Sequence, residues 1–175
     1  MNYDNLDRSL EEIVDRYRLS FANKVFLEES SEEDDLMKLF GLTQATKAQN
    51  KQYWGRELGA CWERLVKEIC QQTCDNYCEP QNSTYDLLVG RDAIDTKYRI
   101  GSGDAKTLRG WRQNGQDLLS RKLRPILLII RNDSLQQAIA TCRAGGWVVK
   151  SGNDAYDYLY ELTQFDLQTW LRNKG

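Results

Sequence analysis

The sequence predicts one α/β domain, in which a mixed central sheet is flanked by helices. Three observations lead to this prediction. Helical periodicity dominates the N-terminal part of the chain, two short strands follow it around a glycine turn, and strands then alternate with helices. At 175 residues the chain is long enough to build one hydrophobic core, and it is short for two.

Apolar residues at every third or fourth position mark the expected helices. The first helix, over residues 4–20, is amphipathic, and a short second helix over 36–40 ends at Gly41. The strongest helical pattern covers 56–74, with Trp62 on its apolar face. The other helices expected from this pattern cover residues 105–123, 134–144 and 154–171.

Runs of β-forming residues mark the expected strands. Two strands over 84–89 and 93–99 are joined by a turn within residues 90–92. The run over 126–131 is almost continuously apolar, which predicts a strand that is buried on both faces. A last short strand is expected over 147–150.

Composition excludes several kinds of chemistry. The chain contains no histidine, which removes serine–histidine and cysteine–histidine catalysis and every metal site that needs imidazole. Its five cysteines, an odd number, favour reduced thiols and a cytoplasmic protein. Because no apolar run is long enough to cross a bilayer and no signal peptide is visible, we expect no membrane partner. Any hydrolysis must therefore rely on carboxylates, lysine and a metal ion.

Three of the cysteines recur every four residues, at Cys70, Cys74 and Cys78, with Cys61 as the only sensible fourth. They allow two interpretations, ligands of an iron–sulfur cluster or small packing residues on a helix. We favour packing, because small cysteines on a helix face are usually buried for that reason.

Charge is distributed unevenly along the chain, although the net charge is only −2. Residues 1–35 contain eleven acidic and four basic side chains, whereas residues 96–124 contain eight basic and two acidic ones. A basic segment of this kind predicts either a surface that contacts phosphates or a solvated helix face.

A short segment with two aspartates and a lysine is the clearest functional signal. If residues 90–91 form a two-residue turn, paired positions sum to 181, and Asp86 lies directly opposite Asp95. Side chains alternate along a strand, so Lys97 lies on the same face as Asp95. Two carboxylates and an ammonium then meet at one end of the hairpin. Asp92, next to the turn, is a competing candidate for the first acid.

This combination suits the hydrolysis of phosphodiesters. Two neighbouring carboxylates fit a hard divalent cation such as Mg²⁺, with Mn²⁺ able to substitute. A bound metal lowers the pKa of its water and stabilises negative charge on a phosphate. Lys97 would position or deprotonate the attacking water. The alternative is a chance coincidence of common residues.

The same residues resemble the PD-(D/E)xK nuclease superfamily and, within it, the type II restriction endonucleases. The matching pieces are, in chain order, Gly59-x-x-Trp62-Glu63-x-x-Val66, Tyr85-Asp86-Leu87-Leu88-Val89 and Asp95-Thr96-Lys97-Tyr98-Arg99. The residues that follow Lys97 are also similar to those of ApaLI-like restriction enzymes. The resemblance covers about residues 55–131.

The resemblance implies a restriction-endonuclease-like three-layer sandwich. Residues 55–175 would form the nuclease core, and residues 1–54 an N-terminal helical region for DNA recognition or dimerisation. It also implies that Asp86 and Asp95 bind the metal and that Lys97 acts on the water.

A helical acid completes the set that the resemblance implies. Glu63 would be an auxiliary metal ligand or would bind water, with Glu57 as the alternative. Two departures from the family pattern are tolerated within it, Tyr85 in place of proline and Asp95 in place of glutamate.

The predicted function is a Mg²⁺-dependent type II restriction endonuclease that cuts double-stranded DNA as a homodimer, because two strands at a symmetric site need two active sites. The alternatives are a repair, mobile-element or structure-specific nuclease of the same fold, and a non-catalytic DNA-binding module. Residues expected to contact DNA are basic or offer amides or a hydroxyl. They are Lys47, Asn50, Lys51, Arg99, Ser102, Lys106, Arg109, Arg112, Gln113 and Asn114.

Overall fold

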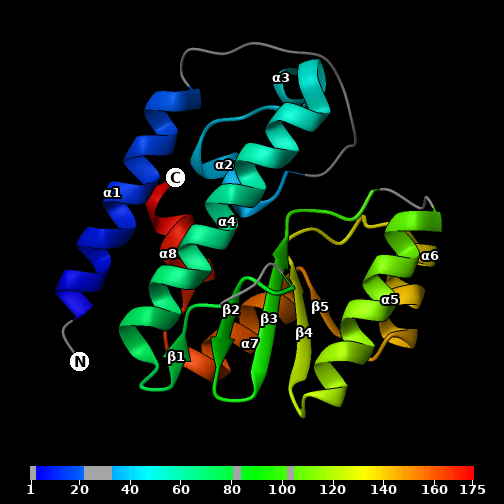
Figure 1. The fold of residues 1–175 in the computed structure, drawn as a ribbon. Coiled ribbons are helices and arrows are strands. Elements are labelled where there is room, and N and C mark those ends of the chain that lie inside the picture. Colours follow the sequence, from blue (N-terminus) through cyan, green and yellow to red (C-terminus); the bar gives the residue numbers. More distant parts are fainter. Residues whose placement is uncertain (1–2, 22–32, 81–83, 102–104) are drawn as a thin grey trace. The chain divides into compact units, whose positions relative to one another are not determined.

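The computed structural model describes residues 3–21, 33–80, 84–101 and 105–175 (Figure 1). The chain forms two compact units. The helical unit comprises Met1–Thr73 and Leu159–Gly175, and the sheet unit comprises Cys74–Tyr158. These bounds differ from the predicted division at residues 54 and 55, because the long helix before the strands belongs with the N-terminal helices.

Two long helices form the centre of the helical unit. Helix α1 (Tyr3–Phe21) buries Leu6, Leu10 and Val14, and α4 (Lys51–Thr73) buries its apolar face, which includes Trp62. Three apolar residues of α1, spaced by four, thus pack on one side of that helix, as its amphipathic pattern predicts. The smaller helices of this unit are α2 (Asp35–Leu39), α3 (Gln44–Lys47), the 3-10 turn η1 (Ala48–Asn50) and α8 (Leu167–Lys174).

The sheet unit contains a five-stranded mixed sheet in the order β1-β2-β3-β4-β5. Its strands are β1 (Tyr77–Cys78), β2 (Leu87–Val89), β3 (Asp92–Lys97), β4 (Arg124–Ile129) and β5 (Val148–Ser151). The first three pair antiparallel, and the last three pair parallel through helical crossovers. The predicted mixed sheet flanked by helices is confirmed.

One face of this sheet packs against α5 (Ala105–Ser120) and α6 (Gln136–Ala144), which lie together beside β4 and β5 in Figure 1. The apolar residues of this layer come from both strands and helices. They are Ala93, Leu127 and Ile129 of the sheet together with Leu118, Ile139, Cys142 and Trp147. Asp95 and Lys97 follow Ala93 at alternate positions of β3, so the same face carries the charged residues of the predicted site.

The β2–β3 hairpin has the predicted register. Leu87 pairs with Ile94, Leu88 with Ala93 and Val89 with Asp92, so each pair sums to 181. Gly90 occupies the turn with φ +60, a backbone conformation that glycine adopts at little cost. The turn chemistry therefore sets which face of β3 each charged residue occupies.

Other elements differ from the predictions. Strand β1 was not predicted, and β2 begins three residues later than expected. Helix α4 begins at Lys51 rather than residue 56, because the preceding polar segment is helical and Asn50 Oδ1 accepts a hydrogen bond from Tyr53 N at 3.1 Å. The single closing helix predicted over 154–171 is wrong.

That closing segment forms two helices, α7 (Asn153–Thr163) and α8. The chain turns at Gln164, whose φ is +58, and Asp166 caps α8 by accepting from Thr169 N at 2.9 Å. Within the described ranges, every helix is too short or too polar to span a bilayer.

Candidate active site

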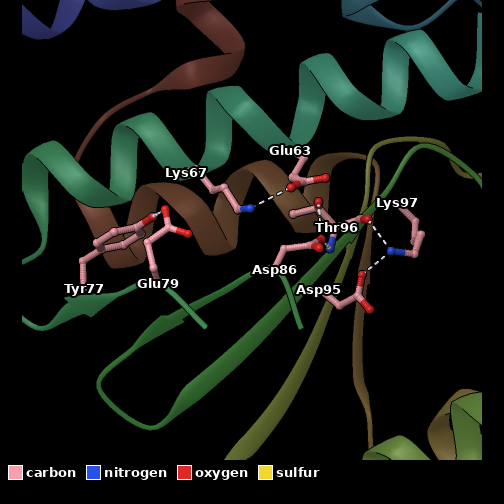
Figure 2. A network of polar contacts seen from close by, with 8 residues as sticks. All are labelled: Glu63, Lys67, Tyr77, Glu79, Asp86, Asp95, Thr96 and Lys97. Carbon is pink, nitrogen blue, oxygen red and sulfur yellow. Dashed lines mark hydrogen bonds and ion pairs between the residues drawn. The ribbon is translucent and has the colours of Figure 1, made fainter. Parts of the chain in front are cut away.

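Asp95 and Lys97 form an ion pair on β3 (Figure 2). The Lys97 ammonium donates to Asp95 Oδ1 and also to the backbone carbonyl of Thr96, at 2.9 Å. This agrees with the expectation that alternation along the strand places both side chains on one face.

Asp86 lies immediately before β2 and reaches the same edge of β3. Its amide donates to the Ile94 carbonyl at 2.8 Å, and its carboxylate Oδ2 accepts from both Thr96 N and Thr96 Oγ1, each at 2.7 Å. The ladder between β2 and β3 ends at Leu87, so β2 offers no backbone partner to the Thr96 N–H. The Asp86 side chain supplies that partner, as Figure 2 shows.

The two aspartates interact, although they are not partners in the ladder. Asp86 lies close enough to Asp95 to affect its ionisation, and Asp95 is only 8% exposed. Burial, with a smaller contribution from the Asp86 carboxylate, raises the pKa of Asp95 to about 7 against the opposing effect of Lys97. The protonated form of Asp95 is thereby favoured relative to an exposed aspartate, and a bound cation would favour the ionised form.

A small pocket lies between β3 and α5, beside the Asp95–Lys97 ion pair. Its volume is about 190 Å³, and Asp95 and Lys97 form its strand side. The helix side consists of Thr107, Gly110, Trp111 and Asn114. These four recur at the spacing of one helix face, a periodicity that is visible in the sequence, although only Asn114 of the four was predicted there to have a functional role.

Asp92, the competing first acid, has a different environment. It is 8% exposed and accepts hydrogen bonds from Arg124 Nε at 2.6 Å and from the Tyr158 hydroxyl at 2.5 Å. Alternation along β3 directs Asp92 away from the face that carries Asp95. Burial, followed by this hydrogen bond, raises the pKa of Tyr158. The geometry is that of a structural ion pair, and it favours Asp86 as the first acid.

Glu63 and Glu57 both lie on α4, in the helical unit. Glu63 Oε1 accepts a hydrogen bond from Lys67 Nζ at 2.7 Å, one turn further along the helix (Figure 2). Glu57 lies 3.8 Å from the Arg56 guanidinium. A role for either acid in the site stays a prediction.

Five residues predicted to contact DNA lie on α5. Lys106, Arg109, Arg112, Gln113 and Asn114 are all exposed, and Asn114 also lines the pocket. The helix thus presents exposed basic and amide side chains on the element that forms one wall of the pocket at Asp95.

Two further predicted DNA contacts follow β3. Arg99 donates from Nε to the Asp133 carbonyl at 3.0 Å and lies 3.3 Å from that residue's carboxylate. This pair ties the end of β3 to the loop after β4, which gives Arg99 a structural role. Ser102 lies outside the described residues.

The predicted contacts in the helical unit are less uniform. Lys47 is only 7% exposed, with its ammonium 3.5 Å from the Met37 sulfur, so it is buried and not on the surface where a phosphate contact was expected; that contact stays a prediction. Asn50 and Lys51 are exposed where α4 begins, and the Asn50 side chain caps that helix.

The described residues contain no group of three or more histidine, cysteine, aspartate or glutamate side chains that could hold a metal. All five cysteines are free. Of the four considered above, Cys61 and Cys70 are buried, as packing residues are, whereas Cys74 is half-buried and Cys78 is exposed.

Comparison with known proteins found no significant match. No protein-family model matches the chain, and no curated protein or solved structure matches it significantly.

Proposed function

We propose that this protein is a magnesium-dependent endonuclease that hydrolyses phosphodiester bonds in DNA. One observation carries the proposal: Asp95, which has Asp86 as a neighbour, pairs with the Lys97 ammonium, and these two residues line a pocket whose other wall is the basic helix α5. Structural ion pairs also perturb pKa values, but here the perturbed carboxyl lines a pocket, which favours a functional site.

The donor set fits Mg²⁺. This ion binds hard oxygen ligands, takes few of them from protein and keeps several waters, so two carboxylates suffice. The raised pKa of Asp95 reflects the cost of ionising a buried carboxyl beside a second carboxylate, which a divalent cation would offset. When bound, the ion would lower the pKa of its water and stabilise charge on the scissile phosphate.

The protein's own groups have separate tasks in this proposal. Asp86 and Asp95 bind the cation, and the two Thr96 hydrogen bonds fix the direction of the Asp86 carboxylate. Lys97 donates hydrogen bonds that position the attacking water and the phosphate oxygen. Glu63 is proposed as an auxiliary group on the resemblance alone.

Helix α5 would bind the DNA backbone through its exposed basic residues. Phosphate contacts give affinity without reading sequence, whereas amides such as those of Gln113 and Asn114 can read base edges. The narrower proposal is a type II restriction endonuclease that acts as a homodimer on double-stranded DNA. A structure-specific nuclease and a non-catalytic DNA-binding module are the alternatives.

A cleavage assay tests these proposals. Supercoiled plasmid is incubated with the protein in Mg²⁺ or Mn²⁺, beside Asp95→Asn, Lys97→Ala and the control Asp117→Asn, which removes an exposed acid of α5. We expect the wild type and the control to cut, and the two site variants to bind DNA without cutting it.

The products separate the alternatives. Discrete fragments from a long duplex would support restriction activity, whereas preference for junctions or single strands would support a structure-specific nuclease. Binding by every variant without any cleavage by the wild type would reject the nuclease proposal.

A further inference from the structure

A pair of tryptophans lies beside the Lys97 ammonium. Trp111 belongs to the α5 wall of the pocket, and the Lys97 Nζ lies 5.5 Å from the centroid of its ring. Trp147 packs against Trp111 with the ring centroids 5.5 Å apart and the planes at 74°. The ammonium thus contacts an aromatic ring that is itself packed against a second ring.

Backbone hydrogen bonds hold this pair in place. The Trp147 indole N–H donates to the Trp111 carbonyl at 2.8 Å, and the Trp147 amide donates to the Cys142 carbonyl at 3.1 Å. Trp147 is 3% exposed immediately before β5, whereas Trp111 is only partly buried. The packing therefore fixes the α5 backbone at Trp111, so that its ring is held at the wall of the pocket.

Lys97 needs such a support if it is to act at a defined position. A lysine side chain has four flexible carbons and about 2 kcal/mol of rotamer entropy, so one ion pair leaves the ammonium free to swing. Three groups surround it here: the Asp95 carboxylate, the Thr96 carbonyl and the Trp111 ring. The first two groups belong to β3 and accept hydrogen bonds from the ammonium, and the Trp111 ring limits the movement of the ammonium toward α5.

We propose that Trp111 is a positioning residue for Lys97, which holds the ammonium over the Asp95 carboxylate in the place where a phosphodiester of the DNA chain would react. The inference rests on the proposed function. It assigns Trp111 to the chemical step and not to stacking on a base, because the ring is already in contact with Lys97 and packed against Trp147.

A kinetic comparison of substitutions separates positioning from binding. Trp111→Leu removes the aromatic ring, Trp111→Phe keeps a smaller one, and Trp170→Leu is the matched control on α8 of the helical unit. We expect Trp111→Leu to lower kcat about two- to thirtyfold, the range of a cation–π contact, with KM for DNA within about twofold of wild type. Trp111→Phe should recover most of the loss.

Three outcomes would overturn the proposal. Unchanged kcat in Trp111→Leu would show that the ring is dispensable, and a raised KM with unchanged kcat would make Trp111 a DNA-binding residue. An equal loss of kcat in Trp170→Leu would indicate a general effect of destabilisation.

A spectroscopic measurement tests the contact without cleavage. In metal-free protein with ¹³C-labelled lysine, we expect an upfield ring-current shift of the Lys97 ε-methylene protons, assigned by their loss in Lys97→Arg. The shift should vanish in Trp111→Leu and persist in Trp111→Phe and Trp170→Leu. If it is absent from the wild type, the proposal is wrong, whereas a protein that shows the shift but never cuts DNA fails only the proposed function.

Discussion

Thr96 donates two hydrogen bonds to one oxygen of Asp86, from its amide and from its hydroxyl, each at 2.7 Å. The amide is the group that β2 would have paired had that strand continued. The Asp86 side chain thus accepts the hydrogen bond from Thr96 N that the backbone of a longer β2 would have accepted. In return, the two Thr96 donors orient the carboxylate of the first acid of the site.

Replacing the Thr96 hydroxyl tests this orientation. Thr96→Val keeps the side-chain shape and the amide bond but removes one donor, so we expect Mg²⁺ to bind about tenfold more weakly, the lower end for loss of an outer-shell partner. Titration of Mg²⁺ by calorimetry measures the change. Thr96→Ser keeps a hydroxyl and should bind like wild type, and equal affinities in all three proteins would contradict the orienting role.

The raised pKa of Asp95 predicts how stability depends on pH. Because the folded protein holds this proton up to a pKa of about 7 and the unfolded chain releases it near 3.8, the contribution of Asp95 to the free energy of unfolding is most favourable at low pH. Without metal, the free energy of unfolding should fall as pH rises from about 4 to 7 and then level off. The loss is on the order of a few kcal/mol, since each pH unit between the two pKa values is worth about 1.4 kcal/mol.

Urea unfolding in EDTA at several pH values measures this contribution. The side chain in Asp95→Asn cannot titrate. The difference in free energy of unfolding between the wild type and this variant should therefore fall as pH rises from about 4 to 7. Mg²⁺ should stabilise the wild type more at pH 8 than at pH 6, because the ion competes with the proton. Identical pH dependence in the two proteins would mean that Asp95 ionises normally.

Two glycines of α5 should respond to alanine with opposite signs. A Cβ at Gly115 would lie 2.4 Å from the Gly145 carbonyl oxygen and 2.7 Å from the Trp147 indole nitrogen, whereas a Cβ at Gly110 would meet nothing within 4 Å. Gly115→Ala should therefore cost about 1–3 kcal/mol through overpacking. Gly110→Ala should stabilise the protein by up to about 1 kcal/mol through helix propensity. Chemical denaturation measures both, and destabilisation of equal size would contradict the packing explanation.

Sequence periodicity predicted most of the secondary structure and the hairpin register, because both depend on local rules. The turn geometry predicted the register of β2 with β3, and hence the face of β3 that carries Asp95 and Lys97; the structure has that register. The direction of the Asp86 side chain could not be predicted in the same way, since it depends on where β2 ends. The same limit explains Lys47, whose burial beside Met37 comes from tertiary packing.

Arg112 should contribute to DNA affinity through charge alone. It is exposed on α5, and removal of one cation that neutralises a phosphate reduces the slope of log affinity against log salt by about 0.9. Arg112→Ala should therefore weaken binding of unrelated duplexes to a similar extent and reduce the slope by about that amount. Fluorescence anisotropy in EDTA, where no cleavage occurs, measures both.

Arg99→Ala is the informative comparison for Arg112, because Arg99 already pairs with Asp133. Its removal should reduce thermal stability while leaving the salt slope within error of wild type. A slope that changes with Arg99→Ala and not with Arg112→Ala would move the phosphate-binding surface from α5 to the segment after β3. Because Arg99 lies two residues beyond Lys97, the DNA path would then follow the end of the sheet rather than the helix.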